Sequence, residues 1–159
     1  MSDRTARLER VVADSVREQP AGGTTCGLGV DVVSISRFCR LWNERGDTLR
    51  RIVFTAGEIE YARSRSDTDQ RLAGTFAAKE AVFKSIGLRW SHGAFSWTMI
   101  EILRDQTGAP HVALRDLAWT GFVRSGAASV LLSISYEDDI AIAVAQTVAA
   151  AQPVGEQPS

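Results

Sequence analysis

The sequence predicts an α+β fold in which a mostly antiparallel sheet packs against one long central helix. The stretch 72–86 is alanine-rich and free of proline, and Gly87 follows it as a residue suited to end a helix in the left-handed conformation. Most segments with strand-like patterns are joined by short turns, which is typical of hairpins. Helices and strands do not alternate regularly, and this order disfavours a doubly wound parallel sheet.

Length and composition limit the class of protein. The chain has 159 residues, 45% hydrophobic and 23% charged, which suits one domain with a substantial core. The net charge of −1 gives no overall case for binding nucleic acid or a membrane. No apolar run reaches membrane-spanning length, the N-terminus is charged, and Cys26 and Cys39 lack metal-ligand spacing. We therefore expect a cytoplasmic protein with two free thiols.

The two ends of the chain differ from its middle. Residues 1–25 are expected to form a helical extension, because four apolar residues share one helical face: Leu8, Val11, Val12 and Val16. Residues 151–159 hold two prolines and no core residues, so we expect a disordered tail. Residues 26–150 are the predicted folded domain.

The first strand is predicted over residues 28–33, where successive side chains point to opposite faces. One face carries Leu28, Val30 and Val32, and the other carries Gly27, Gly29, Asp31 and Val33. Asp31 is an acid inside a run of β-branched residues, and the glycines allow a close approach of another backbone or a ligand. Asp31 either caps the next helix or ligates a metal.

An arginine-rich segment follows this strand. Ser34 is suited to cap a helix over residues 35–43 whose inner face is formed by Phe38, Leu41 and Trp42. Residues 37–51 contain five arginines and two acids: Arg37, Arg40, Arg45, Arg50 and Arg51 against Glu44 and Asp47. This segment is either a solvated helix face or a dock for an acidic protein or for phosphate groups.

The remaining elements follow in order. Thr55 and Glu58 have the spacing of a capping box that begins a short helix, with Ile59 and Ala62 on its inner face. Beyond the central helix we expect a strand at 95–103, a turn at 105–108, a strand at 111–114, a helix from Asp116 to about Ser125, and strands at 129–135 and 140–148.

Glu80 is the unusual residue of the central helix. Asp67 and Gln70 have capping-box spacing before this helix. Its core-facing stripe holds Leu72, Phe76 and Phe83, and Glu80 lies on the same stripe with Lys84 one turn further on. A carboxylate there is costly unless a cation or metal compensates it. Glu80 therefore either forms an ion pair with Lys84 or joins Asp31 at a metal ion.

Five motifs carry a family resemblance: Gly27-Leu28-Gly29-Val30-Asp31, Phe54-Thr55-Ala56-Gly57-Glu58, Phe76-Ala77-Ala78-Lys79-Glu80-Ala81, Gly108-Ala109-Pro110 and Ser133-Ile134-Ser135. In this order, over residues 27–149, the chain resembles the 4′-phosphopantetheinyl transferases, closest to the small holo-acyl-carrier-protein synthase branch. The resemblance implies that family's α+β fold and a homotrimer with active sites between subunits.

The resemblance also implies an activity and its residues. The expected reaction is Mg²⁺-dependent transfer of the phosphopantetheine arm of coenzyme A to a serine of an acyl or peptidyl carrier protein, with release of adenosine 3′,5′-bisphosphate, in fatty-acid or polyketide biosynthesis. Asp31 and Glu80 match the magnesium ligands, and together with Lys84, which matches the lysine on the pyrophosphate, they form the implied catalytic set. Lys84 and five further residues match the coenzyme site: Lys79, Gly108, Pro110, Ser135 and Tyr136. Arg37 and Arg40 match the basic residues that hold the acidic helix of the carrier.

Three positions depart from the family pattern. Tyr136 replaces a histidine, Thr75 an arginine, and Ala109 a frequent lysine or arginine, so each change removes a cation from the implied coenzyme site. Arg89 and His92, in the loop after the central helix, are possible replacements. Two functions therefore stay open: a working transferase with altered carrier or coenzyme preference, and a non-catalytic relative that binds a carrier protein or assembles with an active homologue.

Overall fold

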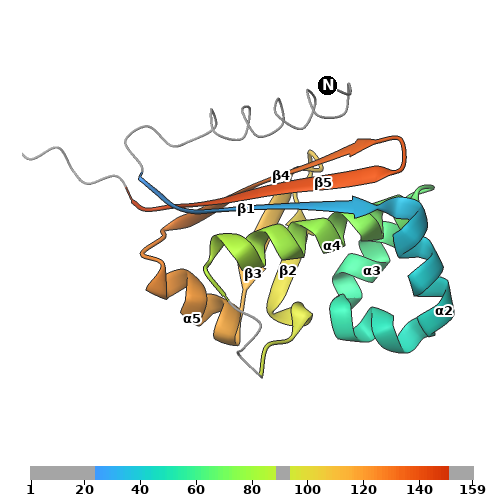
Figure 1. The fold of residues 1–159 in the computed structure, drawn as a ribbon, viewed down its shortest axis with the longest axis horizontal. Coiled ribbons are helices and arrows are strands. Elements are labelled where there is room, and N and C mark those ends of the chain that lie inside the picture. The colour runs from blue at the N-terminus through green and yellow to red at the C-terminus, as the bar shows by residue number, and fades with distance from the viewer. Residues whose placement is uncertain (1–23, 89–93, 151–159) are drawn as a thin grey trace, which may run out of the picture.

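The computed structural model describes residues 24–88 and 94–150, without the side chains of residues 45 and 47–49. In chain order its elements are β1 (Thr25–Ser34), α2 (Ile35–Val53), α3 (Ala56–Arg63), α4 (Thr68–Ser85), the 3₁₀ turn η1 (Trp97–Met99), β2 (Ile100–Arg104), β3 (Pro110–Leu114), α5 (Asp116–Arg124), β4 (Ser129–Glu137) and β5 (Ile140–Val148). Strands β1, β5 and β4 form one layer above the long helix α4 (Figure 1).

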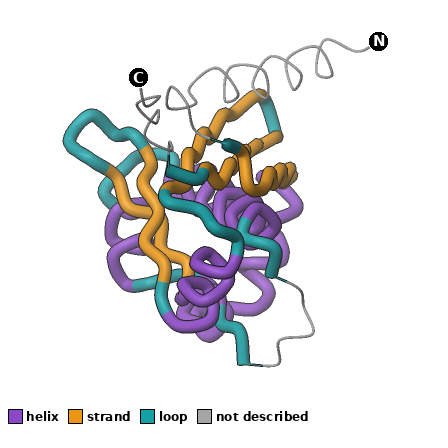
Figure 2. Tube along the Cα trace, turned by 90° about the vertical axis from the view of Figure 1, so that its left-hand side faces the viewer, coloured by secondary structure: helices purple, strands orange, loops and turns teal. Residues whose placement is uncertain are grey.

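Two antiparallel sheets carry the fold. The larger one has the order β1-β5-β4, and β2 and β3 form a separate hairpin. Figure 2 shows the two sheets as distinct groups of strands, with the helices beneath the larger one. In the larger sheet Asp31 pairs with Ala143 of β5, and Ala143 pairs in turn with Ile134 of β4. The predicted α+β fold with antiparallel strands around a central helix is confirmed.

Helix α4 lies unusually close to β1 because small residues meet at their contact. A Cβ atom on Gly29 would overlap the carbonyl oxygen of Ala81, and one on Gly27 would overlap that of Ser85. The backbone of the helix therefore approaches the strand to a distance that only glycine permits. Ala77 and Ala81 on the facing side of α4 have no exposed surface. The predicted close approach at these glycines is confirmed.

Several local signals gave the correct structure. Ser34 is the N-cap of α2 and its side chain accepts a hydrogen bond from the backbone N–H of Arg37. Thr55 and Glu58 form a complete capping box at the start of α3. Gly87 ends α4 with a φ of +69°, in the left-handed region. These three signals depend on neighbouring residues only, which explains why sequence patterns found them.

Two helices begin where the sequence predicted, but without the expected side-chain caps. Asp67 is the N-cap of α4, but its side chain makes no capping hydrogen bond and instead forms an ion pair of 2.9 Å with Arg71. Asp116 is the first residue of α5 with a φ of +50°, and the N-cap is Arg115. At both positions an acid with cap-like spacing takes a different role.

Three further expectations need correction. Leu41 is 45% exposed, whereas its predicted partners Phe38 and Trp42 are buried. Helix α2 continues to Val53 across a break at Gly46, where the backbone leaves helical geometry. The strand predicted from residue 95 begins only at Ile100, after the turn η1.

Three predictions fall outside the described residues: the N-terminal helix, the replacement cations Arg89 and His92, and the C-terminal tail. Only the end of the N-terminal extension is described, and there Thr25 already belongs to β1. Among the helices that the structure describes, none combines the length and the apolar character needed to cross a membrane.

Candidate active site

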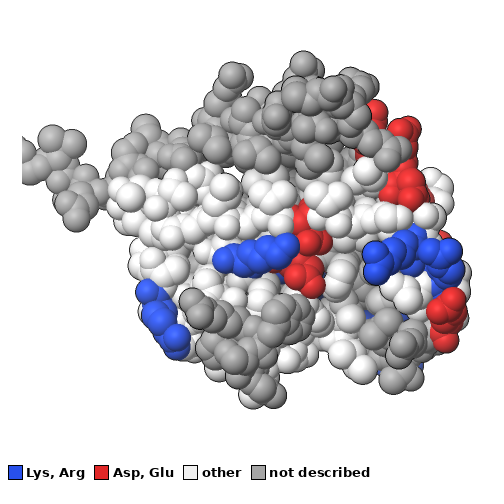
Figure 3. All heavy atoms as spheres, in the orientation of Figure 1, with Lys and Arg blue, Asp and Glu red and all other residues white. Residues whose placement is uncertain are grey.

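Asp31 and Glu80 come together at one hollow of about 330 Å³ between β1, α2 and α4. Asp31 lies on the face of β1 that contacts α4, because Gly29, two residues earlier, touches that helix. Arg37 lines the same hollow beside the rings of Phe38 and Phe76. Acidic and basic side chains meet at the middle of this face of the molecule, over β1 and α4 (Figure 3). The two acids that the sequence singled out thus share one site.

Lys84 supplies the cation of this site. Its Nζ lies 2.9 Å from Asp31 Oδ1 and donates a second hydrogen bond, also of 2.9 Å, to the carbonyl oxygen of Val30. The side chain of Lys84 is 46% exposed and that of Asp31 is 19% exposed. The ammonium group is therefore held at the rim, where it can also contact a ligand.

No side chain in the described part of the chain forms an ion pair with Glu80. Burial raises the pKa of Glu80, the negative charge of Asp31 raises it further, and Lys84 opposes both. Two carboxylates compensated by one lysine leave a site that favours an additional cation.

The two acids fit a magnesium ion. No group of three or more histidine, cysteine, aspartate or glutamate side chains with metal-binding geometry occurs in residues 24–88 and 94–150. Mg²⁺ usually takes one or two protein carboxylates and fills its remaining positions with water and substrate phosphate oxygens. A pair of carboxylates at the mouth of a hollow matches that donor set.

Arg37 is positioned by the turn between β4 and β5. Asp139 in that turn accepts hydrogen bonds from the backbone N–H of Ser36 at 2.7 Å and from the hydroxyl of Ser34 at 2.8 Å. These bonds hold the first turn of α2 against the sheet, so that Arg37 lines the hollow. Arg40 is also exposed but does not line it. The two arginines matched to the carrier therefore differ in their distance from the acids.

Lys79 is a correction to the predicted coenzyme site. Its side chain is fully buried, forms an ion pair of 2.8 Å with Glu58, and donates hydrogen bonds to the carbonyl oxygens of Trp97 and Ile100. Burial lowers the pKa of Lys79 and raises that of Glu58. Lys79 precedes Glu80 by one residue, which turns it about 100° around the helix and into the core. Its role is structural.

The other residues matched to the coenzyme lie on a different side of α4. Tyr136 is on β4 and its ring packs against Gly74, where any Cβ atom would overlap the phenol. Gly74 and Glu80 are six residues apart, about 9 Å along the helix axis. Asp31 and Tyr136 lie on the two outer strands of the sheet, with β5 between them, a separation of about 10 Å.

The β2–β3 hairpin carries the remaining matched residues. Pro110 pairs with Arg104, and Gly108 turns the loop with a φ of +88°. None of the hollow's lining residues comes from this hairpin or from β4, which also carries Ser135. Within one chain, therefore, the predicted site residues other than Lys79 form two separate groups: Asp31, Glu80, Lys84 and Arg37, with Arg40 further along α2, in one, and Gly108, Pro110, Ser135 and Tyr136 in the other.

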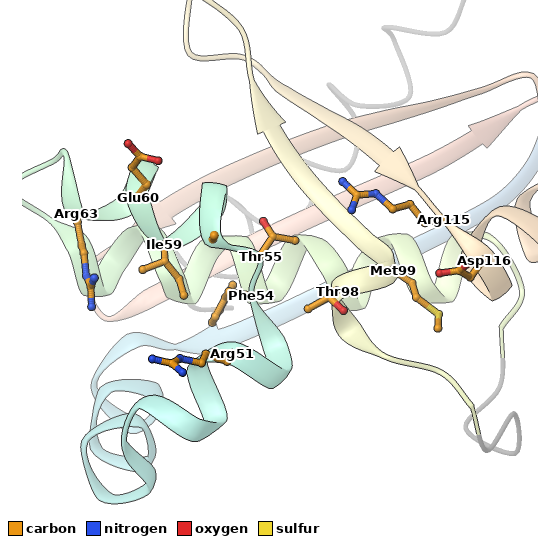
Figure 4. A pocket seen from close by; sticks show the side chains of 11 residues that line it. Arg51, Phe54, Thr55, Ile59, Glu60, Arg63, Thr98, Met99, Arg115 and Asp116 are labelled. Carbon is orange, nitrogen blue, oxygen red and sulfur yellow. The ribbon is translucent and has the colours of Figure 1, made fainter.

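A second hollow, of about 740 Å³, lies between α3 and the start of α5 (Figure 4). Arg51, Arg63 and Arg115 line it together with the apolar side chains of Ile59 and Met99. None of the predicted site residues borders it. Sequence patterns did not indicate this hollow, because its walls come from three segments that are distant in the chain.

Known proteins resemble this chain in sequence and in structure. A curated holo-[acyl-carrier-protein] synthase of Geotalea daltonii is 38% identical over 118 residues, which cover 74% of this chain and 94% of the relative. The crystal structure of holo-[acyl-carrier-protein] synthase from Neisseria meningitidis superposes with a TM-score of 0.70 at 30% identity, over 78% of this chain and 98% of the other. The ACPS–CoA complex of Chronobacterium ammoniagenes superposes with a TM-score of 0.64 at 29% identity, over 77% and 96%.

The sequence profile of the 4′-phosphopantetheinyl transferase superfamily matches residues 27–145. That range runs from β1 almost to the end of β5 and so includes both groups of predicted site residues. Together with the relatives above, this match shows that the chain belongs to the 4′-phosphopantetheinyl transferase superfamily.

Proposed function

We propose that this protein transfers the 4′-phosphopantetheine arm of coenzyme A to a serine of an acyl or peptidyl carrier protein in a Mg²⁺-dependent reaction. The observation that carries the proposal is that Asp31 and Glu80 share one hollow, with Lys84 at 2.9 Å from Asp31. The relatives named above are holo-acyl-carrier-protein synthases, and one of the similar structures is a CoA complex. Both facts support the same chemistry.

The two acids in the hollow and Lys84 beside it each contribute to the proposed reaction. Asp31 and Glu80 are the groups that would hold Mg²⁺, which supplies a positive charge to offset charge developing on the pyrophosphate. Lys84 at the rim contacts the pyrophosphate with its exposed ammonium group. Glu80 is also the carboxylate that we propose to accept the proton of the attacking serine.

The reaction balances as a single displacement. The serine oxygen of the carrier forms a bond to the phosphorus on the pantetheine side of the pyrophosphate, and the bond from that phosphorus to the bridging oxygen breaks. Adenosine 3′,5′-bisphosphate leaves, and the serine proton passes to Glu80. Such phosphoryl transfer depends mainly on positioning and on electrostatic stabilisation of the phosphate oxygens.

We also propose that the active protein is a homotrimer in which one chain supplies the Asp31–Glu80 hollow and its neighbour supplies Tyr136 and the β2–β3 hairpin. The support is the separation of the two groups, since Asp31 and Tyr136 lie on opposite outer strands of one sheet. Light scattering of the full chain in solution tests this assembly, and a monomer that is fully active would contradict it.

The transfer proposal is tested with the intact protein, coenzyme A, Mg²⁺ and a panel of apo carrier proteins. Mass spectrometry should detect carriers that have gained the phosphopantetheine arm. Asp31→Asn and Glu80→Gln should each abolish transfer, and a chelator should do the same to the unaltered protein. Glu60→Gln is the matched control, since Glu60 is an exposed carboxylate at the other hollow. Transfer that survives both site substitutions would overturn the assignment of the acids.

A non-catalytic carrier-binding relative is the second candidate. It is favoured by the lack of a cation at Thr75, Ala109 and Tyr136. This alternative predicts that carrier proteins bind, with an affinity that Arg37→Glu reduces, while no member of the panel is modified. Calorimetry beside the mass assay separates the two candidates.

A further inference from the structure

Asp139, in the turn between β4 and β5, accepts hydrogen bonds from the junction where β1 passes into α2. Its carboxylate accepts from the backbone N–H of Ser36 at 2.7 Å and from the hydroxyls of Ser34 and Ser36, each at 2.8 Å. Its backbone carbonyl oxygen accepts from the N–H of Ile35, also at 2.8 Å. These four bonds join the turn to the Ser34–Ser36 junction.

The bonds to Asp139 complete the N-terminal cap of α2. The first four N–H groups of a helix have no acceptor within the helix. Ile35 and Ser36, the first two residues of α2, donate theirs to Asp139, and Arg37 donates its own to the Ser34 hydroxyl at 3.3 Å. A carboxylate is also favoured at the positive end of the helix dipole. The cap therefore depends on Asp139, which follows Ser36 by 103 positions.

The Ser34–Ser36 junction forms one wall of the hollow that contains the two acids. Ser34 and Arg37 line this hollow, and Asp31 lies three residues before Ser34 on β1. The Arg37 N–H donates to the Ser34 hydroxyl, which in turn donates to the Asp139 carboxylate, so Arg37 is linked to the turn through Ser34. Asp139 itself is exposed and does not line the hollow. Its hydrogen bonds act on the site through the groups that they hold.

We propose that Asp139 is a positioning residue that sets the affinity of this protein for its carrier, an inference that rests on the proposed function. The carboxylate holds the first turn of α2 in place and so directs Arg37 toward the acidic carrier at the mouth of the hollow. Without it, the Ser36 N–H and the two serine hydroxyls lose their shared acceptor, and Arg37 is free to leave its position.

The charge of Asp139 gives this inference a distinctive sign. Asp139 is negative and bonds to the residue that precedes Arg37. If only its charge mattered, removing it would make the surface more basic and would strengthen the attraction for an acidic carrier. Positioning predicts the opposite, a weaker complex.

Calorimetry of the full chain with an apo acyl carrier protein measures this sign. Asp139→Ala should weaken carrier binding about 10-fold, the usual loss for one charge-assisted hydrogen bond, and Asp139→Asn, which keeps one acceptor oxygen, should recover part of the loss. Asp138→Asn is the matched control. It removes the same charge from the same turn, at a φ of +48° that asparagine tolerates, and should leave the affinity unchanged or slightly higher. Tighter binding by Asp139→Ala would overturn the inference.

A double-mutant cycle tests whether the effect passes through Arg37. In a chain that already carries Arg37→Gln, Asp139→Ala should weaken carrier binding no further, whereas its loss should add to that of Arg40→Gln. In the transfer assay Asp139→Ala should raise the KM for the carrier and leave kcat and the KM for coenzyme A unchanged. A fall in kcat with a rise in both KM values would overturn the positioning role and make Asp139 a structural residue.

Amide hydrogen exchange, which needs neither carrier nor transfer, reports the position of the helix start. In Asp139→Ala the amides of residues 35–37 should exchange faster, while those of residues 38–42 should not. Unchanged exchange, or faster exchange without a change in carrier affinity, would overturn the inference. Weaker carrier binding by Asp139→Ala without any transfer would sustain it while the transferase proposal fails, and transfer with an unaltered carrier affinity would do the reverse.

Discussion

Lys84 Nζ lies 2.9 Å from Asp31 Oδ1, so the ammonium group that leaves the central helix is held by the first strand. The helical neighbour Glu80, one turn earlier, has no such ion pair among the described side chains. Lys84 thereby compensates part of the negative charge of the two acids, as a metal ion would. The contributions of the metal ion and of Lys84 can therefore be measured separately.

Removal of the lysine charge should affect metal binding and transfer in opposite directions. Lys84→Met leaves two uncompensated carboxylates, so Mg²⁺ should bind the protein alone more tightly than it binds the unaltered chain. The transfer rate should fall at least about 10-fold, because a charge-assisted contact with the pyrophosphate is lost. Calorimetry with Mg²⁺ and the mass assay measure the two effects. Weaker metal binding in this variant would show that Lys84 does not compete with the ion.

Arg37 should matter more than Arg40 for the carrier protein. Arg37 lines the hollow and Arg40 does not, so charge reversal at Arg37 acts closer to the reacting serine. Arg37→Glu should raise the KM for the carrier more than Arg40→Glu does, and the KM for coenzyme A should stay constant. Carrier affinity should also fall with added salt. Arg124→Glu on α5 is the control, and a salt-independent affinity would remove the electrostatic contribution.

Gly29→Ala should separate the two acids. Its Cβ would overlap the backbone oxygen of Ala81, and the helix has to move away from β1 to admit it. We expect a loss of about 1–3 kcal/mol in the free energy of unfolding, together with loss of Mg²⁺ binding. Gly57→Ala, whose Cβ would meet no atom nearer than 3.6 Å, should be neutral or stabilising by up to about 1 kcal/mol. Urea unfolding, monitored by circular dichroism, compares the free energies of unfolding of the two variants.

The buried pair of Lys79 and Glu58 should behave as a unit. Lys79→Met leaves the Glu58 carboxylate buried without its cation and should cost about 3–5 kcal/mol in the free energy of unfolding. The double variant Lys79→Met, Glu58→Gln should recover much of that loss, because no unpaired charge remains. Additive losses in the double variant would show that the two side chains act independently. The transfer rate per folded molecule should change little, in contrast to Glu80→Gln.

The hairpin loop should keep its structure in mild acid. Asp105 accepts hydrogen bonds from the Thr107 hydroxyl, from His111 and from the backbone of the loop, and these hold the pKa of Asp105 well below its usual range. A depressed carboxyl pKa contributes stability that is present above the unfolded value, about 3.9, and is lost as pH falls through the folded value. An NMR titration of the Asp105 carboxyl group should show the depressed pKa, and Thr107→Ala should raise that pKa.

Sequence patterns predicted the parts of this fold that depend on neighbouring residues. The cap at Ser34, the capping box of Thr55 and the left-handed Gly87 are local, and each was found. Asp67 is the predicted N-cap of α4, but its carboxylate pairs with Arg71, one turn later, and makes no capping hydrogen bond. The strand predicted from residue 95 starts late, and Lys79 binds the carbonyl of Trp97 in the turn that precedes it.

The site was partly visible in the sequence. Asp31 and Glu80 drew attention as acids on apolar faces, and the fold brings them to one hollow. Lys79 was misassigned, because its place beside Glu80 in the motif does not reveal that it points into the core. Asp139 lacks a motif, and only the tertiary structure brings it to the start of α2. Pairings between distant segments were therefore the part that patterns missed.

The three-stranded sheet has a consequence for genetics. Since β5 lies between the strands of Asp31 and Tyr136, damage on one edge leaves the opposite edge of the same chain intact. In the trimer proposed here, a chain carrying Glu80→Gln and a chain carrying Tyr136→Ala, each damaged at a different edge, would form one undamaged active site between them when co-expressed. Two faulty alleles would then complement each other.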